Sequence, residues 1–297
     1  MSSQRFKIFT STESHYSLKK GAVALGFGTD SIVSGPVSPS GKMNSERLKF
    51  LIKQSIASGE TPLLVCATAG TTVLGAFDPI EEIAPICKQY GVWLRVDGDW
   101  GWPAIFSKKM SASMIGVEKA DSFTFDAHKL FGAGLTCSFL LTRHKNLLLE
   151  ANDVSGGDYL FHSDDPTIDR GKASWQCGKR ADAVSFWTIW KSLGTDGLQE
   201  TLDRLISIRD ETVLWIKKEP RLELICEPEY LNVCVRLNPP SRNWSRKVRE
   251  HLKEQNQAMV NFSKNQDSVF LRLIFAHPHL EFEHLREILD SALGVLE

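Results

Sequence analysis

The sequence predicts an α/β fold: a mostly parallel sheet with flanking helices, followed by a small α+β unit. Strand-like and helix-like segments alternate up to about residue 150, a pattern typical of a parallel-sheet domain. Residues 151–178 are polar, rich in Gly, Asp and Ser, and show no clear periodicity, so we expect a long loop there. Strands and helices then return. We therefore expect a large domain at residues 1–195 and a small domain at 196–297.

Short apolar runs mark the strands of the large domain. We expect strands at residues 7–11, 62–68, 92–97, 122–126 and 137–142, and an extended segment at 31–37. Helical spacing predicts helices at residues 15–26, 43–58 and 78–91. In the last of these, Asp78 is expected to cap the start, Pro79 lies in the first turn and Gly91 follows the end.

The second half of the chain alternates differently. Residues 180–217 read as helical, with a break expected near Gly194. Strands are expected at residues 222–227, 231–237 and 269–275, and helices at 244–255 and 282–297. This mixture predicts the small α+β domain.

Composition narrows the classes of function. The 297 residues are 42% hydrophobic and 24% charged with a net charge of -1, which argues against a general nucleic-acid or membrane binder. No apolar run approaches the roughly 20 residues that cross a bilayer. The six cysteines form no CxxC pair, so we expect buried free thiols, a reducing cytoplasmic location and no metal site. Met110, Met114 and the eight tryptophans are expected in the core.

Polar residues of defined chemistry follow three of the predicted strands. Asp97 ends one, His128 and Lys129 follow another, and Thr71 and Thr72 follow a third. Ligands of open α/β sheets collect at the carboxyl ends of strands, so these side chains are expected to meet. A lysine that forms an imine and an acid that keeps a pyridine nitrogen protonated are what pyridoxal 5'-phosphate requires.

A series of motifs carries a resemblance that is more specific than any single residue. The motifs are FTSTESHYSLKKGAVALGFGTDSI, GKMNSERL, PLLVCATAGTTVLGAFDPIEEIAPIC, VWLRVDGDWG, DSFTFDAHKL, DYLF, QCGKRAD and YLNVC. In this order they resemble the group II pyridoxal-phosphate-dependent amino acid decarboxylases, most closely the acidic branch of glutamate, aspartate and cysteine sulfinate decarboxylases. The resemblance implies a fold type I transferase-like architecture that is N-terminally incomplete.

The resemblance also implies roles for individual residues. Lys129 would carry the cofactor as an internal aldimine, Asp97 would pair with the ring nitrogen, and His128 would lie near the phosphate. His15 would stack over the ring and assist proton transfer, so His15 and Lys129 are the expected catalytic residues. Thr71 and Thr72 would line the cofactor or substrate side. Arg272 would hold the substrate α-carboxylate, a task that suits a guanidinium fork.

Each of these residues also has a plainer interpretation when it is considered alone. Asp97 would then be a turn residue, His15 an ordinary surface or core histidine, and Arg272 a solvated strand residue. Thr71 and Thr72 would be β-branched residues at a strand end. Only the occurrence of all these residues together, in the order of the family motifs, favours their assignment to the cofactor site.

The chain departs from the family pattern in three places. It begins just before FTS, so the Gly-rich phosphate-binding segment and the N-terminal dimer arm of the family are expected to be missing. Asp99 stands where the family has an alanine that packs on the cofactor ring, and a carboxylate there should be unfavourable. No tyrosine lies between Phe161 and Gln176, where many members carry a proton donor; His162 and Thr167 are the candidates in its place.

Three functions remain open at this point. The first is decarboxylation of a small acidic amino acid of the cysteine sulfinate, glutamate or aspartate class, by a homodimer or a dimer with a full-length homologue. The second is a truncated or degenerate non-catalytic paralogue that acts as a partner subunit. The third keeps the cofactor but changes the reaction to aldehyde synthesis or transamination.

Overall fold

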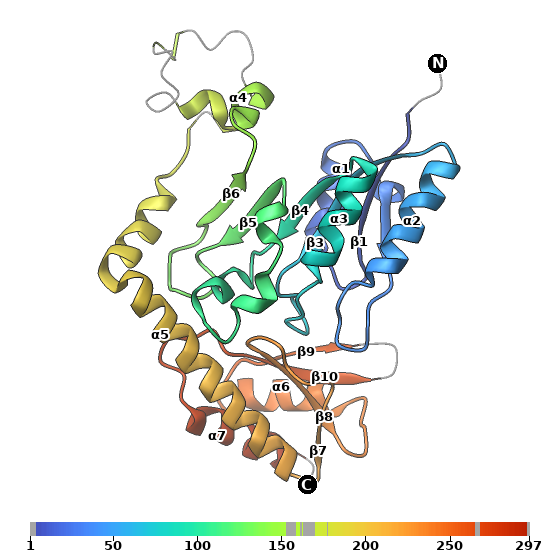
Figure 1. The fold of residues 1–297 in the computed structure, drawn as a ribbon. Helices are drawn as coiled ribbons and strands as arrows, with labels where there is room; N and C mark the ends of the chain where they lie inside the picture. Colours follow the sequence, from blue (N-terminus) through green and yellow to red (C-terminus); the bar gives the residue numbers. More distant parts are fainter. Residues whose placement is uncertain are drawn as a thin grey trace.

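A mostly parallel six-stranded sheet forms the centre of the larger part of the molecule. The computed structural model describes residues 4–152, 159–160, 162, 170–176, 178–264 and 268–295. The strands are β1 (Phe6–Ser11), β2 (Ile32–Gly35), β3 (Thr61–Thr68), β4 (Trp93–Asp97), β5 (Ser122–Asp126) and β6 (Ser138–Thr142). Their order is β2-β1-β3-β4-β5-β6, and only β6 is antiparallel to its neighbour (Figure 1). The predicted parallel sheet is therefore confirmed.

Helices α1 (Ser17–Ala24), α2 (Ser45–Ala57) and α3 (Ile80–Tyr90) flank this sheet. The apolar stripe of α3 buries Ile80, Ile83 and Cys87, which recur at helical spacing. Burial of such a side chain stabilises the fold by roughly 1.5–3 kcal/mol. As expected, Gly91 follows the helix in the left-handed conformation, with φ of 64°, that glycine adopts without steric cost.

Asp78 does not cap α3, and this prediction was wrong. Pro79 is the residue that precedes the helix, and no side chain caps it. The Asp78 carboxylate instead accepts hydrogen bonds from the backbone N–H groups of Met43 and Thr68, each at 2.7 Å. It therefore joins the end of β3 to the segment before α2. Burial raises the pKa of Asp78 to about 6.

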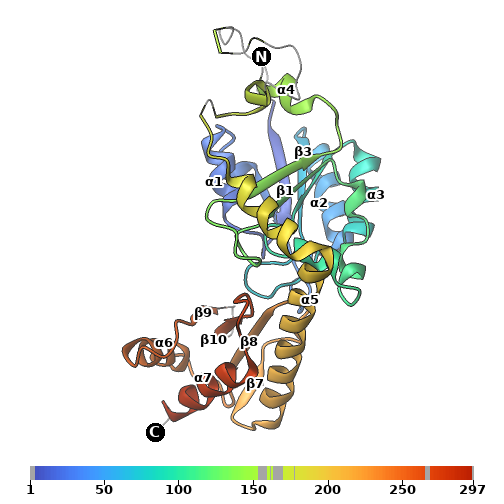
Figure 2. The ribbon, with the colours of Figure 1, turned by 90° about the vertical axis from the view of Figure 1, so that its left-hand side faces the viewer.

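The second half of the chain forms an antiparallel four-stranded sheet with two helices beside it. Its strands are β7 (Leu222–Leu224), β8 (Asn232–Leu237), β9 (Asn261–Lys264) and β10 (Val269–Ile274), in the order β7-β8-β10-β9. The helices are α6 (Trp244–Glu254) and α7 (Phe282–Gly294). Figure 2 shows this unit below the large sheet, with α5 running between the two. Strand β9 and the short helix α4 (Leu147–Asn152) were not predicted.

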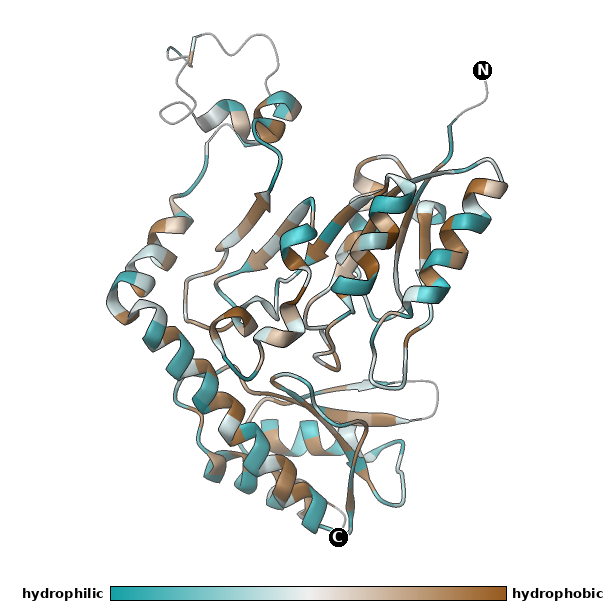
Figure 3. Ribbon diagram, viewed as in Figure 1, coloured by the Kyte–Doolittle hydropathy of each residue, from teal (hydrophilic) through white to brown (hydrophobic). Residues whose placement is uncertain are grey.

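Helix α5 (Asp182–Lys218) spans both parts of the molecule and breaks where the sequence predicts. Gly194 has non-helical dihedral angles, with φ of 66° and ψ of 178°. Figure 3 shows alternating hydrophobic and hydrophilic turns along α5, in agreement with a helix that packs by one face. We propose the boundary between the two domains at residues 195/196, directly after this break.

The predicted burial of cysteine, methionine and tryptophan side chains is confirmed for some residues and wrong for others. The described cysteines are free thiols: those at positions 66, 87, 137 and 234 are buried as predicted, whereas Cys226 is half-buried, and Cys177 lies outside the described residues. Met110 and Met114 are buried as predicted. The assignment of all tryptophans to the core was wrong: Trp175, Trp187 and Trp190 are 86%, 60% and 38% exposed. The last two lie in the first half of α5, which presents mainly Phe186 to the core. Within the described ranges, no helix is both long and apolar enough to cross a bilayer.

Candidate active site

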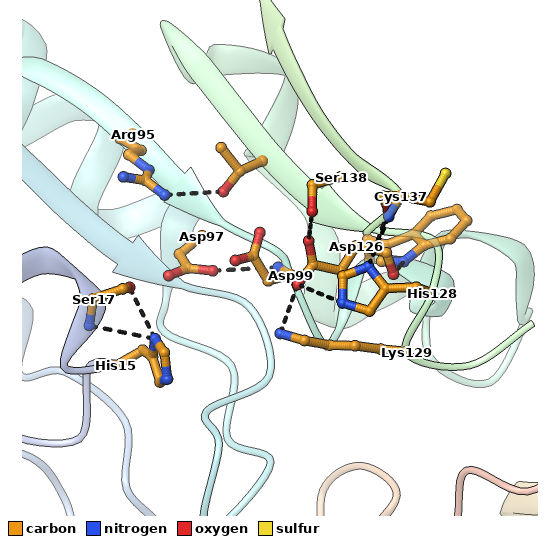
Figure 4. A network of polar contacts seen from close by, with 12 residues as sticks. His15, Ser17, Arg95, Asp97, Asp99, Asp126, His128, Lys129, Cys137 and Ser138 are labelled. Atoms are coloured by element: carbon orange, nitrogen blue, oxygen red, sulfur yellow. Dashed lines mark hydrogen bonds and ion pairs between the residues drawn. The ribbon is translucent and has the colours of Figure 1, made fainter. Parts of the chain in front are cut away.

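The polar residues predicted from the sequence gather at the carboxyl edge of the large sheet. Because β1, β3, β4 and β5 are parallel, the segments that follow them emerge on the same side. Figure 4 shows His15, Asp97 and Lys129 facing the same space, each from a different strand end. The structure thus brings together the three residues on which the predicted chemistry depends.

Lys129 lies in a turn that buried apolar residues hold in place. Ala127, Leu130 and Phe131 are 0%, 2% and 7% exposed, whereas the Lys129 side chain is 37% exposed. The Lys129 Nζ lies 2.9 Å from Oδ2 of Asp126, the last residue of β5. The turn therefore fixes the lysine backbone and leaves the amine beside a carboxylate at the open edge of the sheet.

Asp97 is the last residue of β4 and is buried, with 7% of the residue exposed. Its Oδ1 accepts a hydrogen bond from the backbone N–H of Asp99 at 3.2 Å. Gly98 between them has no side chain for a steric reason: a Cβ atom there would overlap the Phe123 ring and lie 3.1 Å from the Thr124 carbonyl oxygen. The backbone directly after Asp97 therefore lies closely against β5.

His15 follows β1 and is positioned by its own turn. Its Nδ1 lies 2.8 Å from Ser17 Oγ, and its ring lies against Tyr16 at a centroid distance of 4.3 Å. Burial lowers the pKa of His15, and the charge of Asp97 opposes this effect while that of Lys129 adds to it. The imidazole is thus biased towards its neutral form within electrostatic reach of both residues.

His128 is tied to the start of β6. Its Nδ1 lies 3.2 Å from the carbonyl oxygen and 3.3 Å from the backbone nitrogen of Cys137. Its Nε2 lies 3.7 Å from Asp126 Oδ2. Its predicted place near a phosphate stays a prediction.

Thr71 and Thr72 differ in environment. Thr71 is fully buried and its Oγ1 accepts a hydrogen bond from the Ala76 backbone N–H at 3.0 Å, so it supports the loop after β3. Thr72 is exposed, and its carbonyl oxygen accepts a hydrogen bond from the Arg272 guanidinium on β10. Burial lowers the pKa of Arg272. The structure therefore places Arg272 against the loop after β3, with one guanidinium nitrogen, Nη1, donating to a backbone carbonyl.

Asp99 adds a third carboxylate beside Asp97 and Asp126. Burial raises the pKa of Asp99 to about 6, and the charges of Asp97 and then Asp126 add to this effect. The Lys129 ammonium and a hydrogen bond from Thr124 oppose it. Burial and the neighbouring carboxylates thus disfavour the charged form of Asp99, and its expected position against a cofactor ring stays a prediction.

Several polar residues of the site were missed in the sequence. Asp126 lies beside Lys129 in the DAHK motif but received no role. Among the described residues, the hydroxyls of Ser11, Ser14 and Thr68 are buried without a hydrogen-bond partner, at or just beyond the ends of β1 and β3. Buried hydroxyls without partners are uncommon, so they are candidate donors to a ligand. The sequence signal that could have identified these three hydroxyls is that they lie at or just after predicted strands. Of the loop candidates, His162 is exposed and Thr167 lies outside the described residues.

A cavity of about 1020 Å³ lies at the opposite end of the strands and contains none of the predicted site residues. Its lining includes Trp93, Asp121 and His144, where β4 and β5 begin and β6 ends. The His144 Nε2 lies 2.8 Å from Asp121 Oδ1, so these groups satisfy one another. Cavity volume therefore does not identify the candidate site in this fold. The polar side chains at the carboxyl edge of the large sheet identify it.

Known proteins share this sequence and fold over most of the chain. A model of the pyridoxal-dependent decarboxylase conserved domain matches residues 2–238. The acidic amino acid decarboxylase GADL1 of Bos taurus is 38% identical over 305 residues, covering 97% of this chain and 58% of that protein. Cysteine sulfinic acid decarboxylase of Rattus norvegicus is 37% identical over 308 residues, covering 98% and 62%. The crystal structure of mouse CSAD superposes with a TM-score of 0.90 at 34% identity, covering 98% of this chain and 64% of that one.

The chain thus spans about three-fifths of the length of these relatives. The match to the family model extends over the large sheet, α5 and the strands β7 and β8. The predicted resemblance and the predicted fold are both confirmed, and the cofactor that they imply is pyridoxal 5'-phosphate. The chain belongs to the pyridoxal-dependent decarboxylase family.

Proposed function

We propose that this chain contributes to the decarboxylation of a small acidic amino acid, with pyridoxal 5'-phosphate bound covalently to Lys129. The observation that carries the proposal is the convergence of Lys129 and Asp97 at one edge of the sheet. The names of the relatives, acidic amino acid decarboxylase and cysteine sulfinic acid decarboxylase, favour an acidic substrate of the cysteine sulfinate, glutamate or aspartate class.

The residues present fit the ring and the aldehyde of this cofactor. Lys129 offers a primary amine and Asp97 a buried carboxylate, and the unpartnered hydroxyls of Ser11, Ser14 and Thr68 offer donors. When bound, the cofactor supplies a ring that takes up the electron pair released at the substrate α-carbon. In our proposal, Asp97 keeps a proton on the ring nitrogen, because a buried carboxylate gains stability from a facing positive charge.

The other site residues bind the substrate or handle protons. The neutral bias of the His15 imidazole suits a group that packs on a ring and passes a proton. The Arg272 guanidinium would bind the substrate α-carboxylate, since its fork matches the two carboxylate oxygens. It lies against Thr72, so the substrate would bind between β10 and the loop after β3. The buried Thr71 would hold that loop in position.

We further propose that the active assembly is a homodimer, or a dimer with a full-length homologue, in the cytoplasm. The family motifs and the free cysteines support this proposal. No nucleic acid or membrane partner is proposed.

One observation favours a second candidate function. Asp99 places a third carboxylate near Asp97 and Asp126, an arrangement that disfavours a phosphorylated anionic ligand. A non-catalytic partner subunit, which binds no phosphorylated cofactor, would tolerate Asp99, whereas decarboxylation, aldehyde synthesis and transamination all require that cofactor.

Turnover by the purified chain tests the proposal. The chain is supplied with pyridoxal phosphate and with cysteine sulfinate, glutamate or aspartate, and carbon dioxide and products are measured by mass spectrometry. Lysine-dependent release of carbon dioxide with an amine product supports decarboxylation. Lys129→Ala should abolish it, whereas Lys53→Ala, at an exposed position of α2, should not. Aldehyde or keto-acid products would establish the altered reaction instead. No product from the chain alone, together with co-purification with a full-length decarboxylase, would establish the partner-subunit function.

A further inference from the structure

Asp126, the last residue of β5, connects the Lys129 amine to Ser138 on β6 and to the Trp102 indole. Its Oδ2 lies 2.9 Å from Lys129 Nζ, and its Oδ1 accepts a hydrogen bond from Ser138 Oγ on β6 at 2.5 Å. Its carbonyl oxygen accepts a hydrogen bond from Trp102 Nε1 at 3.1 Å. Because the Asp126 side chain is 11% exposed and the Lys129 side chain 37%, we infer that the carboxylate is the fixed partner and the amine the one that can move.

Negative charge exceeds positive charge around this amine. The titratable groups that face it are Asp97 and Asp99 from the end of β4, Asp126 and His128 from the end of β5, and His15 from the end of β1. Among the described carboxylates, Asp126 is the one in direct contact with Lys129 Nζ. Removal of the ammonium would leave this buried carboxylate without its cation, which costs free energy.

We propose that Asp126 is a positioning residue that holds Lys129 as an ion-paired ammonium, so that a cofactor aldehyde can attach to Nζ only after this pair has opened. The reason is chemical: the ammonium has no lone pair, so Nζ must first release a proton to solvent. Its lone pair then attacks the aldehyde carbon, and the C=N bond that forms replaces the C=O bond, whose oxygen leaves as water. The inference deepens the proposed function and rests on it for its role in catalysis. The ion pair itself is tested without any cofactor.

Competitive acetylation of the cofactor-free protein measures how available the amine is. Acetic anhydride transfers one acetyl group to a neutral lysine nitrogen and releases acetate and a proton, and peptide mass spectrometry gives the rate at each lysine. In Asp126→Asn, which keeps an oxygen acceptor but loses the charge, Lys129 should be acetylated roughly fivefold faster at neutral pH, the ratio that corresponds to about 1 kcal/mol for a partly exposed pair.

Three comparisons separate the charge of Asp126 from a merely structural role. Lys217, which pairs with Glu227 at 2.7 Å on the surface, is the internal reference and should keep its rate. Asp126→Glu retains the charge and should stay slow, and Asp99→Asn should have a smaller effect because Asp99 is not in contact with Nζ. Asp126→Ser is a second neutral variant if circular dichroism shows that Asp126→Asn does not fold.

Equal or slower acetylation of Lys129 in the folded neutral variants, with Lys217 constant, would overturn the proposal. A protein that never binds pyridoxal phosphate still gives this result, so failure of the proposed function and failure of the ion-pair inference remain distinguishable.

Discussion

The side-chain oxygen of Asn232 accepts a hydrogen bond from the indole Nε1 of Trp100 at 2.7 Å, and this pair joins the two sheets. The amide nitrogen of Asn232 donates to the carbonyl oxygens of Thr72 and Val73, both at 3.0 Å. Asn232 is 1% exposed. One side chain from β8 therefore satisfies polar groups on the loops after β3 and β4, which carry part of the candidate site.

Asn232→Ala is expected to destabilise the protein by about 2 kcal/mol, because it leaves the half-buried Trp100 indole N–H without its acceptor and removes one of the donors to each of the Thr72 and Val73 carbonyl oxygens. Urea unfolding measures the loss. Gln54→Ala, on the exposed face of α2, is the control and should change the free energy of unfolding by less than about 0.5 kcal/mol. A loss that small in Asn232→Ala would contradict the role of this amide.

Asp99→Asn is expected to stabilise the protein at neutral and alkaline pH. The pKa of Asp99 is raised to about 6, first by burial and then by Asp97 and Asp126. The folded state therefore holds a proton that the unfolded state releases near pH 4, so stability from this group falls as the pH rises from about 4 to about 6 and stays low above that range. Discounted for partial exposure, the gain in Asp99→Asn should be about 1 kcal/mol at pH 8 and smaller at pH 5.

Urea unfolding at these two pH values checks this expectation, with Asp290→Asn on exposed α7 as a control of equal charge. A residual pH dependence should persist in the variant, because burial also raises the pKa of Asp78 to about 6. Equal effects of Asp99→Asn at both pH values would contradict the burial of this carboxyl group.

Arg272→Lys tests the proposed substrate contact. Lysine keeps the charge but not the two-pronged fork, so the KM for the acidic substrate should rise by at least about tenfold while kcat changes less. Steady-state kinetics of the active assembly provide the measurement. Arg286→Lys, exposed on α7, should leave both constants unchanged. An unchanged KM in Arg272→Lys would remove Arg272 from the substrate site.

The large sheet could be predicted because its strands carry their own signal. Runs such as PLLVCAT are apolar on both faces, which is what a parallel strand covered by helices requires. The positions of Asp97 and Lys129 at one edge of the sheet could also be predicted, since both follow strands and parallel strands bring their ends together. The local pattern of apolar and polar residues was therefore sufficient to predict the strands of the large sheet and the residues at their ends.

The missed features depend on partners that are distant in sequence. Asp78 resembled a helix cap, yet its carboxylate bonds the backbone of Met43, 35 residues away. Strand β9 is a short, polar edge strand whose partner is β10, so it has little apolar pattern of its own. The contact between Asp126 and Ser138 requires β6 to pair with β5 in a specific register. Sequence spacing does not encode these pairings.

Mapping the lysine that binds the cofactor tests the central proposal most directly. The purified protein is incubated with pyridoxal 5'-phosphate, reduced with borohydride to fix the bond, digested and measured by peptide mass spectrometry. The expected result is stoichiometric phosphopyridoxyl label on Lys129, loss of that label in Lys129→Ala, and only trace label on exposed lysines such as Lys20. Label scattered over surface lysines, unchanged in Lys129→Ala, would contradict the assignment of Lys129 as the cofactor lysine.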